Sequence, residues 1–434
     1  MPRKFTRIIM GLLVVVFAIS VAGCAPAASP SQGPATVKVL SMEQAGPTVD
    51  EMNSIVADFN KANPNIKVKI DYVSYDALHD KISTAMAANP PSYDVFLTDD
   101  IWYAEFAKNG WALDVTDRVT SDMKSNVFKS AWPITTVGGK QYGMPWLLDE
   151  KYFYYNADIL KAAGFDNPPT TWEEMADQAK VIKQKGLSDF PMVFSWGQAE
   201  AAICDWVVML YGNGGTFMDE QGKPAFNSDK GVAALTWMVQ SINDGLTNPA
   251  SVSDVEEDAR NVFSQGKTAF TTNWVYMYDL ANLSDKESKV TGKVKMALMP
   301  VFKDSGVKGV SINGSMGFSL AAKSPVKDAA WEYVKYLTSE PVQMKYSAHM
   351  LPIWSTSFQG DKVKTLQGLN ASNPVTVPMF NQQFPFAVVR PKVPYYVEGS
   401  KALQLALQQA LTKQKTPKQA LDDAAAQWVT LGAK

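Results

Sequence analysis

The chain has 434 residues, carries a formal net charge of −2 at pH 7 and is 46% hydrophobic. This length is enough for a large core and suggests two domains. The near-neutral charge, without a polybasic run, argues against nucleic acid as a partner. After Cys24, Cys204 is the only further cysteine, so no intramolecular disulfide framework is expected and the fold must depend on its core.

The first segment has the layout of an export signal. Three basic residues within the first seven positions precede an uncharged apolar run that reaches Cys24 and is short for a membrane span. Residues 1–23 are therefore predicted to be a signal peptide. The stretch VAGC (Val21–Cys24) resembles the bacterial lipobox, in which the cysteine becomes the acylated first residue. The alternative is a plain signal peptide with a chance cysteine.

Residues 24–35 are rich in Pro, Ala and Ser and lack large apolar side chains, which is typical of a flexible tether. Acylation of Cys24 would supply the several lipid chains that stable attachment needs. We therefore expect an extracytoplasmic protein that is anchored to the cell membrane by lipidated Cys24.

Strands and helices alternate after this tether. The hydrophobic patterns predict strands over 36–42, 66–73 and 93–100 and helices over 52–62 and 75–88. This order predicts an α/β layer with a largely parallel sheet. Ligands bind at the carboxyl ends of the strands in such sheets, and Asp99, Asp100 and Trp102 would lie there after the third strand.

Further elements follow in the second half of the chain. Thr171 and Glu174 form the spacing of a capping box, and Gly186 is a plausible end of the helix that it opens. Additional patterns predict helices over 231–244, 255–265, 325–338 and 399–412 and a strand over 293–300.

Sequence motifs for catalysis are missing. His79 and His349 are the only histidines, and neither has metal-ligand spacing around it. The chain has no nucleophile elbow, zinc signature or Walker phosphate loop. We therefore expect no catalytic residue, no metal and no cofactor. Asp99 with Asp149 or Glu43 nevertheless leaves open a carboxylate pair for glycoside hydrolysis.

Aromatic residues beside acids or amides stand out instead. They occur in the stretches DDIW, PWLLDE, FSWGQAE, CDWVV, TTNWVYMYD, LPIW and RPKVPYY. Aromatic faces stack on the C–H faces of pyranose rings, while short polar side chains bind hydroxyl groups. The alternative for each residue is partial burial in a core, but the collection favours a carbohydrate site.

Several ordered stretches resemble the extracellular solute-binding proteins of ABC import systems, in the sugar-binding class that includes maltose-binding protein. They are YDVFLTDDIWYAEFAKNGWALDVT, YGMPWLLDEKYFYYN, PPTTWEEM, FSQGKTAFTTNWVYM and MPVFKDSGVKGVSINGSMGFSLAAKSPVKDAAWEYVKYLTS, with RPKVPYYVEGSKALQLALQQALTKQKTPKQALDDAAAQW near the C-terminus. The resemblance implies a two-lobed, type II periplasmic-binding-protein-like fold, each lobe a sheet flanked by helices, joined by hinge segments. It places residues 37–146 plus about 297–328 in lobe 1, and 147–296 plus about 329–434 in lobe 2.

Carried over by position, the resemblance implies a ligand site between the lobes. Trp274 matches an aromatic residue that stacks on sugar, and Asp149 lies just past the first crossing between lobes. The remaining candidates are Glu43, Asp99, Asp100, Trp102, Trp146, Trp196, Gln198, Asn273, Gly314, Ser315, Trp354 and Arg390. Between the adjacent acids Asp149 and Glu150, we expect Asp149 to face the ligand.

The resemblance also implies the function. We expect a monomer that captures a small carbohydrate, closes its lobes by a hinge motion and delivers the ligand to the transmembrane subunits of an ABC permease. Two alternatives remain open from the residues themselves: a secreted carbohydrate-active enzyme, and a binding protein for another solute such as a polyamine, which would suit acids and aromatic rings.

Overall fold

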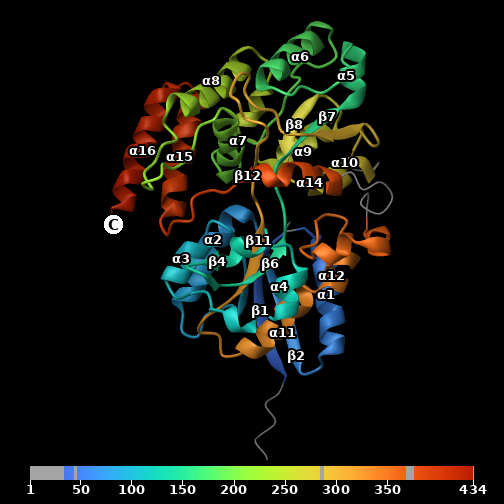
Figure 1. Ribbon diagram of the computed structural model, residues 1–434, viewed down its shortest axis with the longest axis vertical. Helices are drawn as coiled ribbons and strands as arrows, with labels where there is room; N and C mark the ends of the chain where they lie inside the picture. The colour runs from blue at the N-terminus through green and yellow to red at the C-terminus, as the bar shows by residue number, and fades with distance from the viewer. Residues whose placement is uncertain (1–33, 44–45, 284–287, 368–375, 434) are drawn as a thin grey trace, which may run out of the picture.

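The computed structural model describes residues 34–43, 46–283, 288–367 and 376–433. Figure 1 shows two lobes, one above the other, each built on its own sheet with helices around it. The N-terminal elements form much of the lower lobe, and the C-terminal helices lie in the upper lobe. The expected two-lobed α/β fold is therefore confirmed. The signal peptide and Cys24 lie outside the described residues.

The lower lobe, lobe 1, contains a five-stranded sheet in the order β2-β1-β3-β11-β6. Strands β1 (Ala35–Met42), β2 (Ile66–Val73) and β3 (Val95–Asp99) are parallel, whereas β11 (Met316–Leu320) is antiparallel to both β3 and β6 (Met144–Leu147). All five residues of β3 are buried, as expected for a central strand that is covered on both faces. Asp99 is the last residue of β3, so it lies at the end of the central strand that points toward the other lobe.

Helices α1, α2 and α11 pack on the lobe 1 sheet through their apolar faces. Helix α1 begins with a capping box between Thr48 and Glu51 and buries Met52, Ile55 and Phe59. The helices of this lobe are α1 (Val49–Ala62), α2 (Tyr75–Ala87), α3 (Tyr103–Lys108), α4 (Ser121–Asn126), α11 (Lys327–Leu337) and α12 (Glu340–Lys345). Its shorter elements are η1 (Thr116–Arg118), η2 (Trp132–Thr135), β4 (Thr136–Val137), β5 (Lys140–Gln141), η4 (Ser355–Phe358) and η5 (Gly360–Thr365).

The upper lobe, lobe 2, contains an antiparallel sheet in the order β8-β7-β9, formed by β7 (Tyr152–Asn156), β8 (Phe270–Asn273) and β9 (Val294–Ala297). Its helices are α5 (Ala157–Ala163), α6 (Trp172–Gln184), α7 (Glu200–Gly212), α8 (Asp229–Asn243), η3 (Pro249–Val252), α9 (Glu256–Ser264), α10 (Tyr276–Leu283), α14 (Thr376–Gln383), η6 (Phe384–Phe386), α15 (Tyr396–Leu411) and α16 (Pro417–Gly432). The expected capping box at the start of α6 is confirmed.

Three segments of the described chain run side by side where the lobes meet, near residues 148–151, 312–315 and 388–391. Strands β10 (Ser311–Ile312) and β12 (Ala387–Val388) are parallel neighbours in this region. The Gly314 amide donates to the Asp149 carbonyl at 3.0 Å, and the Asn313 amide donates to the Val388 carbonyl at 2.8 Å. These bonds tie the two crossings between the lobes, at 148–151 and 312–315, to the neighbouring segment 388–391, which lies between α14 and α15 of lobe 2.

The lobe borders differ from the expected ones in the second half of the chain. Strand β9, which ends at Ala297, belongs to the lobe 2 sheet, and the return to lobe 1 comes near residue 314. Helix α11 packs on α1 and β11 of lobe 1, where the Tyr333 and Phe59 ring centroids lie 5.3 Å apart. The expected assignment of 297–312 to lobe 1 and of α11, α12, η4 and η5 to lobe 2 is therefore corrected. An amphipathic pattern predicts that a helix has a buried face, but not which sheet that face covers.

Candidate ligand-binding site

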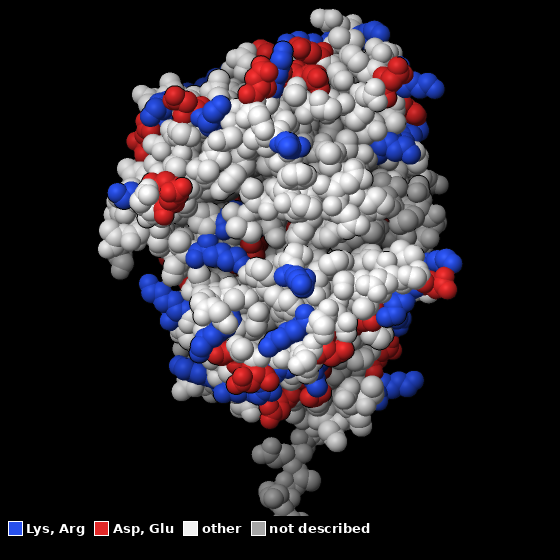
Figure 2. Space-filling view, in the orientation of Figure 1, with Lys and Arg blue, Asp and Glu red and all other residues white. Residues whose placement is uncertain are grey.

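A cavity with a volume of about 290 Å³ lies between the lobes and is lined by residues of both lobes and of the hinge. Figure 2 shows the hollow between the lobes, with acidic and basic atoms near its edge. The polar and aromatic lining residues that we discuss below are Glu43, Tyr75, Asp76, Asp99, Asp149, Glu200, Glu256, Trp274, Tyr276 and Arg390. We call this space the inner cavity.

Trp274 contributes an indole ring to the wall of the inner cavity and is held in place from several directions. Its Nε1 donates to Glu256 Oε1 at 3.2 Å, and its backbone amide donates to Asn273 Oδ1 at 2.8 Å. A Cβ atom on Gly314 would collide with the six-membered part of the ring, so the hinge backbone lies directly against the indole. The ring therefore has a fixed position against which a ligand can stack.

Arg390 occupies the centre of a buried ionic cluster that connects both lobes. Its Nη2 lies 3.1 Å from Asp99 Oδ1 and 3.1 Å from Asp100 Oδ1, both at the end of β3 in lobe 1. Its Nη1 lies 2.9 Å from Glu200 Oε1, at the start of α7 in lobe 2. The Arg390 side chain is only 2% exposed, so three carboxyl groups from two lobes surround one cation away from bulk water.

The surroundings of the Arg390 cluster fix the carboxylates. The Tyr75 hydroxyl donates to Asp99 Oδ2 at 2.7 Å, and the Tyr396 hydroxyl donates to Glu200 Oε1 at 2.6 Å. Burial raises the pKa of Asp100 to about 8, although Arg390 beside it lowers that pKa in part. Near neutral pH the Asp100 carboxyl is thus largely protonated and is able to donate a hydrogen bond.

Asp149 lies at the first crossing and faces the inner cavity, whereas Glu150 does not line it. Asp149 Oδ1 accepts from the Glu150 amide at 2.8 Å and from the Val275 amide at 3.2 Å. Burial raises the pKa of Asp149 to about 8 and that of Glu150 to about 9, so both carboxyls favour the neutral form near pH 7. A neutral carboxyl both donates and accepts, which suits a hydroxylated ligand.

Lys151 lies beneath the site and is fully buried. Its Nζ lies 2.8 Å from Asp205 Oδ1 and 5.5 Å from the centroid of the Trp274 ring. Burial lowers the pKa of Lys151, but the neighbouring Asp205 and other acidic groups raise it more, so the ammonium stays charged. Thr272 and Trp196 donate further hydrogen bonds to Asp205, at 2.8 and 3.1 Å.

The predicted site residues fall into three groups in the structure. Six of them line the inner cavity: Glu43, Asp99, Asp149, Trp274, Gly314 and Arg390. Asp100 is joined to this set through Arg390. Trp102 and Gln198 line a neighbouring hollow, which shares Tyr75, Asp76 and Glu200 with the inner cavity.

The remaining five predicted residues line neither space: Trp146, Trp196, Asn273, Ser315 and Trp354. Trp146 packs edge-on against Phe318, and Trp354 donates to the Thr338 carbonyl at 2.7 Å in lobe 1. Trp196 stacks on Phe194 with centroids 4.6 Å apart. Asn273 and Ser315 support the site instead, since Asn273 caps Trp274 and the Ser315 hydroxyl accepts from the Asp149 amide.

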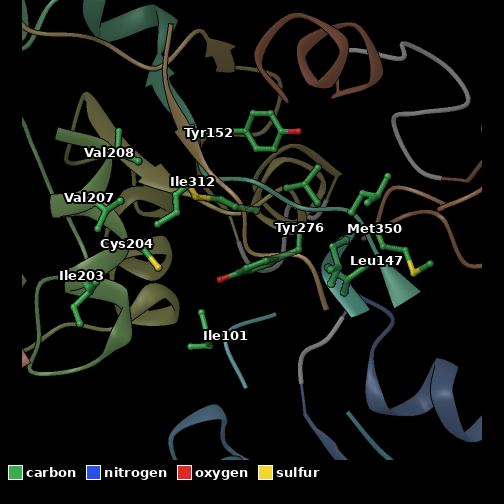
Figure 3. Close-up of a cluster of buried hydrophobic side chains, with 14 of the residues drawn as sticks. Ile101, Leu147, Tyr152, Ile203, Cys204, Val207, Val208, Tyr276, Ile312 and Met350 are labelled. Atoms are coloured by element: carbon green, nitrogen blue, oxygen red, sulfur yellow. The ribbon is translucent and has the colours of Figure 1, made fainter. Parts of the chain in front are cut away.

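Sequence reasoning missed several cavity residues. Tyr75, Asp76 and Glu200 begin helices α2 and α7, and Glu256 and Tyr276 begin α9 and α10. Figure 3 shows Tyr276 among the Cys204, Leu147 and Met350 side chains, which also line the cavity. These residues share one feature, which is a position in the first turn of a helix that begins at the cleft. Acidic and aromatic residues in such first turns are therefore candidates for ligand contact.

The described residues also limit the chemistry of the site. Within residues 34–43, 46–283, 288–367 and 376–433, no group of three His, Cys, Asp or Glu side chains is arranged to hold a metal ion. In the same part of the chain, no helix combines the length and the apolar character needed to span a membrane. The cavity instead offers carboxyl groups, aromatic rings and the Arg390 guanidinium.

Two lobes with a cavity between them, connected by chain crossings at 148–151 and 312–315, are typical of a class of proteins that hold a small molecule between two domains. The family described as bacterial extracellular solute-binding protein matches residues 45–344, and the chain belongs to this family. Members of the family serve ABC transporters by binding a small ligand and delivering it to the permease. The expected family is thus confirmed.

Individual relatives agree with this assignment. A probable ABC transporter-binding protein of Deinococcus radiodurans is 29% identical over 412 residues, which cover 91% of this chain and 93% of that protein. The maltose-bound structure of MalE3 from T. maritima matches with a TM-score of 0.83 and 29% identity, over 92% of this chain and all of that one. A solute-binding protein from Thermotoga lettingae bound to α-D-tagatose matches with a TM-score of 0.81 and 26% identity, with the same coverage.

Proposed function

We propose that this protein binds a sugar or polyol in the inner cavity and delivers it to an ABC permease. The observation that carries the proposal is the position of Trp274, whose ring faces the cavity beside carboxyl groups of both lobes. A pyranose ring would stack on the indole, and its hydroxyls would bond to Asp149, Asp99 and Glu256. The two related proteins described above with maltose and with tagatose support a carbohydrate.

Ligand binding would couple to lobe closure through contacts that exist together only when the lobes meet. Asp76 and Glu256 line the cavity from lobe 1 and lobe 2, respectively, and Glu256 raises the pKa of Asp76 further after burial has raised it. Two carboxylates that face each other oppose closure unless a donor lies between them. A ligand hydroxyl would supply that donor, so the ligand would favour the closed form by its differential affinity.

The same acidic pair makes a cationic ligand the second candidate. A polyamine would bind between Asp76 and Glu256 and contact Trp274 by a cation–π interaction. Asp99, Asp100 and Glu200 surround the Arg390 guanidinium, so this cation does not by itself exclude a positively charged ligand. The sugar is placed first because the two related proteins described above hold maltose and tagatose.

We also propose that the protein is a monomer that stays at the outer side of the cell membrane through acylated Cys24. The VAGC stretch and the tether after it support this anchor. Metabolic labelling with a clickable fatty acid, followed by the Cys24→Ser variant, tests it. Label that persists in the variant would contradict the proposal.

A thermal-shift screen of residues 36–434 against mono- and oligosaccharides, polyols and polyamines tests the ligand class. A ligand that binds only the folded state raises the free energy of unfolding by about 2.7 kcal/mol at a concentration of 100 times its Kd. The melting temperature therefore rises. We expect hits among sugars or polyols. Hits among polyamines alone would reverse the order of the two candidates.

A further inference from the structure

The first halves of β1 and β2 carry exposed lysines on one face of the lobe 1 sheet. In the register of these parallel strands, Lys38 lies opposite Lys69 and Lys67 lies opposite Thr36. Side chains at opposed positions share a face, and residues two apart along a strand share it too. The three lysines are exposed, whereas the alternate positions of both strands are buried or half-buried. We call Lys38, Lys67 and Lys69 the lysine patch.

The lysines of this patch lack acidic partners. Within residues 34–43, 46–283, 288–367 and 376–433, none of them forms an ion pair, whereas Lys345 of the same lobe lies 3.0 Å from Asp58 Oδ2. Like charges directly opposite each other on two strands destabilise a sheet, and Lys38 and Lys69 are placed in this way. The arrangement therefore raises the free energy of the folded state unless a negative partner faces it.

The charged groups around the lysine patch leave it positive. Asp71 follows the patch on the same face of β2 and accepts from the Tyr93 hydroxyl at 2.7 Å. Lys81 Nζ on α2 lies 5.9 Å from the centroid of the Tyr93 ring, so a further ammonium group is near Asp71. Asp94, beside Lys38, is buried and accepts from the Lys38 amide at 2.9 Å. The patch and Lys81 thus stand against one exposed carboxylate, that of Asp71.

Protection of a sheet edge explains only part of the patch. Strand β2 is at the edge of the sheet, and lysines on edge strands prevent pairing with other chains. Lys38 lies on β1, which has β2 on one side and β3 on the other. An inner strand needs no such protection, so the pair of Lys38 with Lys69 indicates a surface that attracts negative charge.

The lysine patch lies at the end of lobe 1 that the tether joins. Strand β1 begins at Ala35, eleven residues after Cys24. Figure 1 shows this end of β1 in dark blue at the lower end of lobe 1, away from lobe 2. Eleven residues span at most about 40 Å when fully extended. With Cys24 acylated in the membrane, the patch is therefore held within that distance of the lipid headgroups.

We propose that the lysine patch docks on the anionic phospholipid headgroups of the membrane. This proposal rests on the anchor at Cys24 proposed above, because the tether supplies the local concentration that a small patch needs. The chain as a whole carries a charge of −2, so attraction to an anionic surface must come from a local patch. Docking holds the amino ends of β1 and β2 against the membrane. The carboxyl end of β3, with Asp99, then points away from the membrane.

Co-sedimentation with lipid vesicles tests the docking surface. The protein is the processed chain, residues 24–434, with Cys24→Ser, so that no acyl chain contributes to binding. The vesicles are phosphatidylcholine alone or with about 30% phosphatidylglycerol, and each lysine near an anionic surface strengthens binding about fivefold. We therefore expect at least tenfold stronger binding to the anionic vesicles. Lys38→Gln, Lys67→Gln and Lys69→Gln together should remove this gain without lowering the melting temperature, since all three side chains are exposed.

A matched variant removes the same charge elsewhere. Lys161→Gln, Lys223→Gln and Lys230→Gln together replace three exposed lysines of lobe 2, and the gain on anionic vesicles should stay within about threefold of that of the unmodified chain. Raising the salt concentration from about 0.05 M to about 0.5 M should abolish the gain, because salt screens exposed charges.

Equal losses in the two triple variants would overturn the docking surface, because net charge alone would then govern binding. Equal binding of the unmodified chain to both kinds of vesicle would overturn it as well, and the fatty-acid labelling of Cys24 would still decide the anchor by itself. If Cys24 takes up no label but the patch binds anionic vesicles, the anchor fails and the docking surface stands.

Discussion

Two buried cations, Lys151 and Arg390, show how similar ionic chemistry serves different purposes in this protein. The Lys151 side chain is 0% exposed and the Arg390 side chain is 2% exposed, and each contacts carboxyl groups. Lys151 pairs with Asp205 inside lobe 2, and Thr272 and Trp196 complete that network. Arg390 instead joins carboxyl groups of lobe 1 to Glu200 of lobe 2.

The difference matters when one partner is lost. A carboxylate that stays buried without its cation carries an uncompensated charge, and this is strongly destabilising. The bonding partners of Asp205 named above all belong to lobe 2, so opening the cleft does not separate them from Asp205. Asp99 and Glu200 come from different lobes, so opening the cleft hydrates them. We infer that Lys151 contributes mainly to the stability of lobe 2, whereas Arg390 contributes mainly to the balance between open and closed lobes.

The largest effect is expected for Lys151→Met. This change keeps most of the side-chain volume but leaves Asp205 buried without its cation, and we expect a loss of about 3–5 kcal/mol in the free energy of unfolding. Urea denaturation measures it. Lys180→Met is the control, because Lys180 forms an exposed pair with Asp177 and should cost no more than about 0.5 kcal/mol. If Lys151→Met and Lys180→Met lose the same free energy of unfolding, then the buried Lys151 pair is not a main source of stability in lobe 2.

Arg390→Met should change the balance between open and closed lobes more than it changes the free energy of unfolding. We expect a larger radius of gyration in small-angle X-ray scattering and a smaller loss of stability than in Lys151→Met. If only about a tenth of the molecules remain competent to close, the apparent ligand affinity falls about tenfold. A variant that unfolds as readily as Lys151→Met, with unchanged dimensions in the folded state, would contradict the role in closure.

Trp274→Ala should separate binding from folding. The half-buried ring lines the inner cavity, and truncation of a central aromatic contact commonly costs about 2 kcal/mol of binding, or roughly 30-fold in Kd. The melting temperature should change little. Trp132→Ala, which removes an equally half-buried indole of lobe 1 away from the cavity, should leave the affinity unchanged. Calorimetry that finds unaltered affinity in Trp274→Ala would rule out the stacking role.

The last prediction concerns the dependence of stability on pH. Burial raises the pKa of Asp100 to about 8, above its ordinary value. The folded state therefore keeps a proton that the unfolded chain releases above about pH 4, and the free energy of unfolding falls as pH rises between about 4 and 8. Each such carboxyl contributes a slope of at most about 1.4 kcal/mol per pH unit in this window.

Asp100→Asn should reduce that slope in urea titrations between pH 5 and 7. Asp114→Asn is the matched control, because hydrogen bonds from Thr116 and Lys140 lower the pKa of Asp114 to about 2. The contribution of Asp114 is lost only as pH falls below about 4, so its removal should leave the slope unchanged. An unchanged slope in Asp100→Asn would show that Asp100 is ionised in the folded protein.

The family and the two lobes were inferred from the resemblance of several ordered stretches to a known family, whereas the individual strands and helices were predicted from local patterns. Alternation predicted β1 and β2, helical spacing predicted α1 and α2, and the Thr171–Glu174 spacing predicted the start of α6. Each of these patterns is satisfied by neighbours in the chain, so no knowledge of distant contacts is needed.

The site was accessible only in part. Asp99, Asp149 and Trp274 line the inner cavity as expected because each follows a strand end or a crossing. Trp146 and Trp196 share the same aromatic and acidic surroundings in the sequence but lie in the cores. Tyr75 and Glu200 had no local signal beyond their place at the start of a helix.

The sequence by itself predicted α/β layers and supplied the aromatic and acidic residues of the cleft, and its resemblance to a known family implied the two lobes. Only the tertiary structure decided which sheet α11 covers and which lobe contains β9. It also decided that Arg390 lies between Asp99 and Glu200, which are 291 and 190 residues away along the chain. The physical reason is that local periodicity records only that a side chain is buried, whereas the partner of a buried charge is set by packing between distant segments.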